Sequence, residues 1–342
     1  MKKNPILQVE NLSVSFKINN TNYMAVGDIS FSLYKKESIA IVGESGSGKT
    51  VTAKAIIGLN PRETSNVDSG HIYYKNTDLL TLSENELRKF RGKEISMIFQ
   101  DPLASLNPTM KIGKQIKESV QQKYPHISNI EALNKVLELL YLVGIPSPAK
   151  TYHAYPHELS GGMRQRVLIA IALGAEPKIL IADEPTTALD VTIQAEILDL
   201  LKRLQEKLGM SIIFITHDMS LVAGFCSEII VMYGGRIVEK APTFTLFEKP
   251  KHPYTKKLIE SIPRFDLKKS DIFTPIDGSP PLLTSSFSGC RFCPRCFHAM
   301  NICNKKNPPN IEMNEENSVA CWLYAKPAQV EIMEDTSCIP LS

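Results

Sequence analysis

Short, wholly apolar segments recur along this chain, each bounded by polar residues and separated from the next by longer stretches of mixed character. Runs of four or five consecutive apolar residues are typical of strands in a parallel sheet that is covered on both faces. Such runs predict buried strands at residues 38–42, 95–99, 179–182 and 211–215. Strict alternation of apolar and polar residues predicts a half-buried strand over residues 7–17.

Amphipathic stretches between these strands predict helices over residues 51–59, 130–143, 160–175 and 191–208. Strands at 229–233 and 236–240 flank a Gly-Gly pair, which is typical of a hairpin. Strands that alternate with helices indicate an α/β sheet with helices on both faces. Residues 101–156 interrupt this order with loops and helical periodicity, so we expect an inserted helical subdomain there.

Composition narrows the class of protein. The chain has 342 residues, of which 43% are hydrophobic and 22% charged, which is enough for a sizeable core. A net charge of +3 is too small to indicate nucleic-acid binding. No apolar run approaches the ~18 residues that span a bilayer, and residues 1–5 lead into a strand pattern and not into the apolar core of a signal peptide. We therefore expect a cytoplasmic protein that meets the membrane only through a partner.

The strongest chemical motif follows the apolar run at 38–42. It reads Gly43-Glu44-Ser45-Gly46-Ser47-Gly48-Lys49-Thr50 and leads into a predicted helix. Glycines let backbone N–H groups close around phosphate oxygens, and the helix N-terminus adds partial positive charge. In this strand–loop–helix context the lysine reaches the β- and γ-phosphates, and the threonine hydroxyl binds Mg²⁺. The motif predicts a nucleoside triphosphate site.

Two acids end the strand at 179–182. Asp183 is placed to hold Mg²⁺, and Glu184 is placed to orient and polarise an attacking water. Phosphoryl transfer depends on positioning and charge neutralisation, which two acids at a strand end supply. A second anion site is expected where Ser160, Gly161 and Gly162 open a helix.

In this order the motifs resemble the ATP-binding cassette family over residues 6–240. The sequence Leu159-Ser160-Gly161-Gly162 matches the family's signature, with Met163 in place of the commoner glutamine. The resemblance implies that Gln100 contacts the metal and the attacking water, and that His217 contacts the γ-phosphate. It also implies that Asp190, the end of Thr187-Ala188-Leu189-Asp190, lies in a loop that crosses a dimer interface.

The family resemblance implies a head-to-tail pair of cassettes, with each ATP between one phosphate loop and the partner's signature. Adenine then stacks on an aromatic residue soon after the first strand. Ile18 occupies that place here, and Phe16 or Tyr23 is the candidate substitute.

Three segments resemble the ATP-binding subunits of oligopeptide and dipeptide permeases: residues 99–108, residues 252–258 and a cysteine-rich tail. Met163 favours the D-type subunit. The resemblance implies a heterodimer with an F-type companion ATPase, two membrane permeases and an extracytoplasmic peptide-binding protein. The chain would then lie peripherally on the cytoplasmic face of the inner membrane. We expect a nucleotide-binding domain over residues 1–250 and an extension over residues 251–342, with residues 263–289 as a linker.

Seven cysteines are present, and the tail holds Cys290, Cys293, Cys296, Cys303 and Cys321. In a reducing compartment such clustering favours a metal over disulfides. Four thiolates suit a [4Fe–4S] cluster or a structural zinc, and free thiols are the third interpretation. Some peptide-permease ATPases carry a cluster here, and the matching positions are Cys290, Cys296, Cys303 and Cys321, with Cys293 as an additional thiol.

Two other functions remain open from the sequence. The same architecture could import nickel or another small solute. A soluble cassette ATPase that acts on DNA or ribosomes is a different class, and it predicts tandem cassettes or long coiled-coil insertions. The chain has neither feature.

Overall fold

The computed structural model describes residues 4–187, 189–262, 278–279 and 288–326. Most of the predicted linker and Cys338 therefore lie outside the described residues. The chain divides into two compact units that interleave along the sequence. The first unit contains residues 4–7, 33–38 and 74–215, and the second contains residues 8–32, 39–73 and the described residues from 216 onward.

Three parallel strands form the sheet of the first unit. They are β6 (Ile95–Ile98), β7 (Ile179–Asp183) and β8 (Ser211–Thr216), and β7 pairs with both of the others. Every residue of β7 and β8 is buried, which confirms the prediction of short strands covered on both faces. The unit also holds the two-residue strand β5 (Thr77–Asp78) and the helix α2 (Glu84–Phe90), which begins at a capping box of Ser83 and Glu86.

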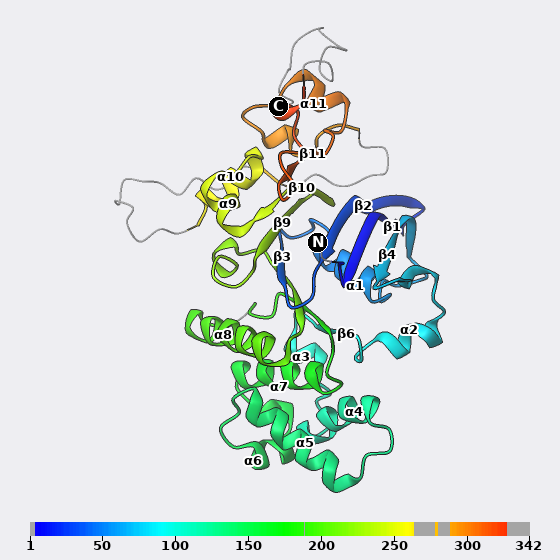
Figure 1. The fold of residues 1–342 in the computed structure, drawn as a ribbon, viewed down its shortest axis with the longest axis vertical. Coiled ribbons are helices and arrows are strands. Elements are labelled where there is room, and N and C mark those ends of the chain that lie inside the picture. The colour runs from blue at the N-terminus through cyan, green and yellow to red at the C-terminus, as the bar shows by residue number, and fades with distance from the viewer. Residues whose placement is uncertain (1–3, 188, 263–277, 280–287, 327–342) are drawn as a thin grey trace. The chain divides into compact units, whose positions relative to one another are not determined.

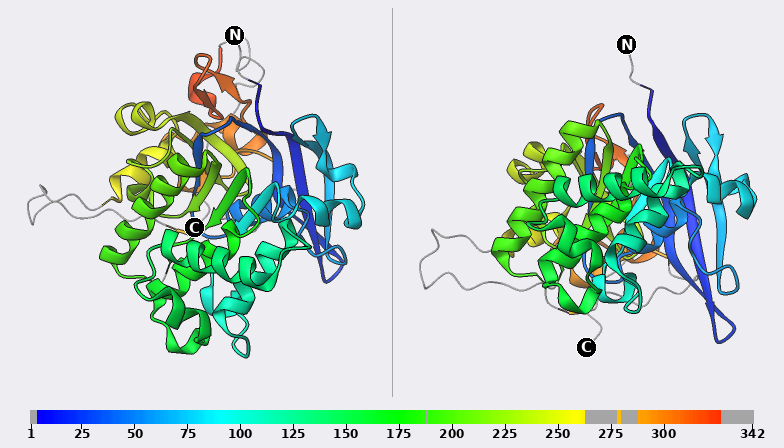
Figure 2. Two further views of the ribbon diagram at one scale, coloured as in Figure 1. Left: turned by 60° about the horizontal axis from the view of Figure 1, so that its bottom comes forward. Right: turned by 90° about the horizontal axis from the view of Figure 1, so that it is seen from below.

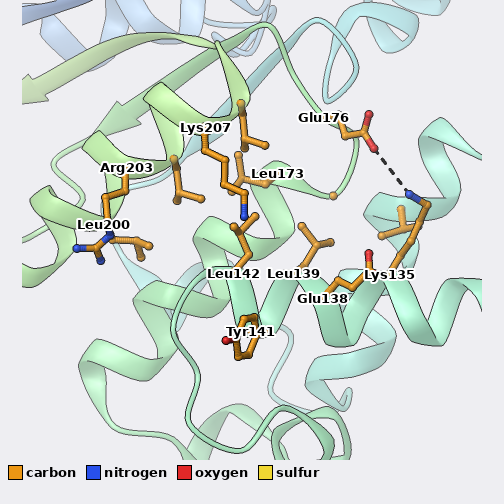
Figure 3. A pocket seen from close by; sticks show the side chains of 14 residues that line it. Lys135, Glu138, Leu139, Tyr141, Leu142, Leu173, Glu176, Leu200, Arg203 and Lys207 are labelled. Atoms are coloured by element: carbon orange, nitrogen blue, oxygen red, sulfur yellow. Dashed lines mark ion pairs between the residues drawn. The ribbon is translucent and has the colours of Figure 1, made fainter.

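Residues 99–160 are all described and form helices but no strand: α3 (Pro102–Ser105), α4 (Ile112–Lys123), α5 (Asn129–Leu142) and α6 (Pro148–His153). Two longer helices follow, α7 (Gly161–Leu173) and α8 (Val191–Leu208). Figures 1 and 2 show α4 to α7 gathered beside one another. The bounds of α5 and α8 confirm the helices predicted from amphipathic spacing. A capping box at Ser128 begins α5, and Gly209 at φ 64° ends α8.

The second unit contains two groups of strands. The long strands β1 (Leu7–Ile18) and β2 (Thr21–Leu33) pair side by side, and β4 (Ser65–Tyr74) lies on the other side of β1. The strand β3 (Ser38–Val42) pairs in parallel with β9 (Glu228–Tyr233), which forms the predicted hairpin with β10 (Arg236–Pro242).

The tail continues this second sheet. The short strand β12 (Ser318–Val319) pairs with β10, and β11 (Ile311–Glu312) pairs with β12. The helices of this unit are α1 (Lys49–Ile56), α9 (Thr243–Glu248), α10 (Pro253–Glu260) and α11 (Asn301–Lys305). Residues of the extension are therefore hydrogen-bonded into the sheet that carries the phosphate loop.

Several elements have weak or misleading sequence signals. β4 reads Ser-Asn-Val-Asp-Ser-Gly-His-Ile-Tyr-Tyr, and its exposed first half carries no apolar alternation. The helix predicted at 51–59 begins two residues earlier, because the glycine before it forms its N-cap, and it ends at Ile56. Periodicity weakens after Pro242, yet α9 and α10 are helices of only six and eight residues, too short for a clear period. No helix within the described ranges combines the length and apolar character needed to cross a membrane.

Candidate nucleotide site

The loop between β3 and α1 has the shape that its glycines predict. Gly46 and Gly48 have φ values of 78° and 97°, which glycine adopts without steric cost. A Cβ on Gly43 would stand 2.1 Å from the Met232 carbonyl oxygen, so no side chain fits there. Lys49 is 5% exposed, and its Nζ donates to the carbonyl oxygens of Gly43 at 2.7 Å and Glu44 at 3.0 Å. Two carbonyl groups of the loop thus hold the lysine ammonium in place.

Neighbouring backbone supports the loop from outside. The N–H of Gly235, in the β9–β10 turn, donates to the Ser47 carbonyl oxygen at 2.9 Å, and the N–H of Gly27 donates to the Gly235 carbonyl oxygen at 2.8 Å. The Ser47 hydroxyl is buried without a hydrogen-bond partner among the described residues. A buried polar atom without a partner calls for an explanation, and a bound phosphate oxygen would satisfy it.

The first unit carries the two acids. Asp183 ends β7 and is 1% exposed. Glu184 follows with φ 48°, in the left-handed region that costs a non-glycine residue roughly 1–3 kcal/mol. Its N–H donates to the Ile215 carbonyl oxygen at 2.9 Å, which holds the turn against the end of β8. Strain of this kind is concentrated at functional sites because the surrounding structure must maintain it.

Two donors orient the Glu184 carboxylate. Gln100 Nε2 donates to Glu184 Oε2 at 2.8 Å, and Thr187 Oγ1 donates to the same oxygen at 3.0 Å. The fold therefore brings together Gln100 and Glu184, which lie 84 positions apart in the sequence. Thr187 belongs to a motif that the sequence identified, but its contact with the acid has no sequence signal.

The Ser160 turn opens α7, a helix of 13 residues. Ser160 is the N-cap, and its Oγ accepts from the Met163 N–H at 3.3 Å. A Cβ on Gly162 would stand 2.9 Å from Ile193 Cγ2 on α8, so this glycine permits the two helices to pack closely. Asp190 is the N-cap of α8 and accepts from the Ile193 N–H at 3.0 Å.

The predicted residues thus fall into two sets. The second unit holds His217, an exposed residue directly after β8, together with the phosphate loop: Gly43, Glu44, Ser45, Gly46, Ser47, Gly48, Lys49 and Thr50. The first unit holds Gln100, Ser160, Gly161, Gly162, Asp183, Glu184 and Asp190. Phe16 and Tyr23 are half-buried and Ile18 is 54% exposed, and their role in adenine binding stays a prediction.

The tail cysteines form a small buried group of their own. Cys293 and Cys303 pack with Trp322, and Cys290 lies against them. Cys303 and Cys321 are electrostatic neighbours of Cys290, and so is Cys293. The Sγ of Cys293 also donates to Asn304 Oδ1 at 3.0 Å. The structure therefore does not separate the additional cysteine from the four predicted ligands.

Burial controls the ionisation of these thiols. Burial, with a smaller contribution from neighbouring thiols, raises the pKa of Cys290 to about 12 and that of Cys321 to about 11. Both groups are therefore neutral thiols at neutral pH. Within the described ranges, no three His, Cys, Asp or Glu side chains are close enough together to hold a single metal ion. The arrangement of the described residues therefore does not support the predicted cysteine-bound metal, whether an iron–sulfur cluster or a single zinc ion.

Comparison with known protein families gives two matches. Residues 26–187 match the family described as ABC transporter. Residues 238–303 match the oligopeptide/dipeptide transporter C-terminal region. The first match contains the phosphate loop and both acids, and the second contains most of β10, all of α9 and α10, and three of the four predicted cysteine ligands.

Two relatives from Bacillus subtilis (strain 168) match almost the whole chain. The dipeptide transport ATP-binding protein DppD is 48% identical over 96% of this chain and 97% of its own length. The oligopeptide transport ATP-binding protein OppD is 50% identical over 93% of this chain and 88% of its own length.

Solved structures show the same fold. The ATP-binding cassette MJ0796, as a post-hydrolysis dimer bound to ADP and Pi, is 28% identical with a TM-score of 0.63 and covers 69% of this chain and 98% of its own. The protein cbiO1 from Clostridium perfringens, part of the cbiONQ transporter complex, is 29% identical with a TM-score of 0.60, over 72% of this chain and 92% of its own. These similarities confirm the α/β nucleotide-binding fold.

Proposed function

This chain belongs to the ABC transporter ATPases of the oligopeptide/dipeptide transport type, and on that premise we propose that it is the D-type subunit that hydrolyses ATP to power the import of short peptides. The proposal depends on sequence identity of 48% to DppD and 50% to OppD along nearly the entire chain. It also depends on the match to the C-terminal region of oligopeptide/dipeptide transporters. The same observations favour peptides over nickel or another small solute.

ATP binding and hydrolysis follow from the two sets of residues. The phosphate loop binds the β- and γ-phosphates through its N–H groups and Lys49. Thr50, Gln100 and the buried Asp183 would hold Mg²⁺ through oxygen ligands, and the ion would supply charge neutralisation for phosphoryl transfer. Glu184 orients and polarises the attacking water, and the hydrogen bonds from Gln100 and Thr187 hold its carboxylate in place. His217 contacts the γ-phosphate.

A second cassette completes each ATP site. The Ser160 turn lies at the exposed N-terminus of α7, where backbone N–H groups and the helix dipole attract an anion. We infer that it binds the γ-phosphate of an ATP held by the companion F-type subunit, and that Asp190 lies at the interface between the two.

The transporter partners are two membrane permeases and an extracytoplasmic peptide-binding protein, with this subunit on the cytoplasmic face of the inner membrane. ATP binding closes the paired cassettes and shifts the permeases, and hydrolysis releases them. We assign residues 1–250 to the nucleotide-binding domain and 251–342 to the extension, and we place the helices between 101 and 156 toward the permeases.

We also propose that Cys290, Cys296, Cys303 and Cys321 hold a [4Fe–4S] cluster. The clustering of cysteines in the sequence, and the packing of Cys290 and Cys303 in one buried group, support the proposal. Anaerobically purified protein should contain about four irons and four sulfides per chain. Stoichiometric zinc, or no metal, would contradict the cluster and leave the ATPase assignment intact.

The importer assignment is tested in the assembled transporter, reconstituted with its permeases and companion subunit. Wild-type protein should show ATPase activity that rises when the binding protein delivers a peptide, together with ATP-dependent peptide uptake. Lys49→Ala should lose ATP binding, because the γ-phosphate loses its ammonium partner. Unchanged ATP affinity in that variant would contradict the assignment of the phosphate loop, and stimulation by nickel in place of peptides would contradict the substrate class.

A further inference from the structure

The segment that links Cys290 to Cys296 lies directly against the phosphate loop within the second unit. The 3₁₀ turn Cys293–Arg295 ends in Arg295, whose Nη1 donates to Glu44 Oε2 at 2.9 Å. Glu44 is the second residue of the loop. The Arg295 side chain is 7% exposed and that of Glu44 is 24% exposed, so water screens this ion pair only weakly.

A second contact reaches the same loop residue from α10. The backbone N–H of Glu44 donates to Tyr254 Oη at 3.0 Å, and the Tyr254 side chain is fully buried. Arg295 Nη1 also donates to Tyr233 Oη at 3.2 Å, at the end of β9. Both the backbone and the carboxylate of Glu44 are thus held by residues from outside the loop.

An aromatic cluster makes this support rigid. The rings of Tyr233 and Tyr254 lie 4.7 Å apart between centroids, and Phe292 packs on both at 5.2 and 5.3 Å. Because Phe292 precedes Cys293, the cluster fixes the turn that carries Arg295. Aromatic pairs at such distances contribute packing beyond their buried area.

Charge explains why this support matters for an anionic ligand. Glu44 is the one acid among the eight loop residues, and nucleotide phosphates would approach it closely. An unpaired carboxylate there would repel them, and the repulsion grows with the charge of the nucleotide. Arg295 neutralises that carboxylate and holds it, and the hydrogen bonds to Glu44 and Tyr233 outweigh burial and raise the pKa of the guanidinium.

We propose that Arg295 is a positioning residue for ATP binding: through Glu44, the cysteine-bearing segment of the extension sets the affinity of the phosphate loop for ATP. The proposal rests on the assignment of that loop as the ATP site. The extension then contributes to nucleotide binding. A change in the conformation of the cysteine segment would therefore change the affinity for ATP.

The test compares four full-length proteins: wild type, Arg295→Gln, Glu44→Gln and the double variant. ATP and ADP affinities are measured by titration, and KM and kcat are measured in the assembled transporter. We expect Arg295→Gln to raise the Kd for ATP about tenfold, which corresponds to ~1.4 kcal/mol. The Kd for ADP should rise less, because ADP carries less charge. KM should rise while kcat at saturating ATP stays within about twofold of wild type, because Arg295 does not touch the reacting atoms.

The double variant separates positioning from damage to the fold. With Glu44→Gln in place no carboxylate is left unpaired, so adding Arg295→Gln should change the Kd for ATP by less than about twofold. A double variant as weak as Arg295→Gln alone would overturn the proposal, as would equal losses for ATP and ADP. Arg295→Lys keeps the charge and should retain most of the affinity, which preserves the test if Arg295→Gln folds poorly.

Lys305→Gln is the matched control, because it removes one positive charge from an exposed position in the same tail. It should bind ATP as wild type does. Lys49→Ala distinguishes an error in the phosphate-loop assignment from an error in the role of Arg295. If it still binds ATP, the loop assignment itself fails. If it loses ATP while Arg295→Gln binds normally, only the role of Arg295 is wrong.

Discussion

Glu184 combines a strained backbone conformation with a fixed side chain. Its φ of 48° lies in the left-handed region, and Gln100 and Thr187 both donate hydrogen bonds to its carboxylate. The strain is maintained because the Glu184 N–H is paired with the Ile215 carbonyl oxygen. Such preorganisation suits a group that must hold a water in line for attack.

We therefore expect Glu184→Gln to bind ATP with nearly unchanged affinity while turnover falls by at least ~100-fold. The amide has the shape of the carboxylate but cannot polarise the water. The measurement is ATP binding and ATPase rate in the assembled transporter, with Glu206→Gln, an exposed acid on α8, as the control. Hydrolysis at the wild-type rate would show that Glu184 has another role.

His252 makes the stability of the extension sensitive to acid. It is 1% exposed, its Nδ1 accepts from the Tyr254 N–H at 3.0 Å as the N-cap of α10, and burial lowers its pKa to about 3. The unfolded chain, with an ordinary histidine pKa near ~6.5, binds the proton first. Stability is therefore complete above pH ~6.5 and falls as the pH drops toward 3, by ~1.4 kcal/mol per pH unit.

His252→Asn should remove this dependence, because asparagine caps the helix and does not titrate between pH 5.5 and 7.5. Wild type should lose ~1.4 kcal/mol more free energy of unfolding than the variant over that range, measured by urea denaturation. Glu239, whose pKa is raised by burial, has the opposite dependence and is present in both proteins. Parallel pH curves would contradict a neutral buried histidine.

Strand, loop and helix act together at the phosphate site. β3 delivers the chain into the loop, Gly48 turns it into α1, and the β9–β10 turn supports it through Gly235. Gly43 is the loop glycine with the least space for a side chain, because a Cβ there would stand 2.1 Å from the Met232 carbonyl oxygen in β9. The loop shape thus depends on the register of β3 against β9.

Gly43→Ala tests that dependence. A methyl group 2.1 Å from a backbone oxygen must displace the loop or β9, so we expect loss of ATP binding and a free energy of unfolding lower by about 1–3 kcal/mol. The matched control is Gly224→Ala, where a Cβ meets nothing within 4 Å. Thermal unfolding and ATP titration of both variants provide the comparison. Equal behaviour of the two would mean that the loop tolerates a side chain at position 43.

The extension is part of the fold of the second unit. β12 pairs with β10, and Arg291 contacts the Gly234 carbonyl oxygen in the same turn that supports the loop. Among the described residues, no helix is long and apolar enough to cross a membrane. The proposed transport function places the chain beside permease partners.

Co-expression with the permeases should therefore move the protein from the supernatant to the membrane pellet, measured by fractionation and immunoblotting. Most of the protein should remain in the supernatant when it is expressed alone, because the proposed attachment to the membrane is through the permeases. Sedimentation that is independent of the permeases would point to direct membrane attachment.

Local patterns along the chain were sufficient for much of this description. Apolar runs predicted β3, β6, β7 and β8, and helical spacing predicted α5 and α8, because both patterns depend on neighbouring residues. The glycines, Lys49 and the acids after β7 were recognisable because phosphate chemistry demands those residue types at short spacings.

Contacts between segments that are distant in the sequence could be identified only in the tertiary structure. Gln100 is an ordinary turn residue until β6 and β7 pair and bring it to Glu184. Arg295 and Tyr254 carry no local signal of their contact with Glu44, because 251 and 210 positions separate them from it. Residues that far apart meet only through strand order and packing, which no local periodicity encodes, and it is through such contacts that the extension meets the phosphate loop.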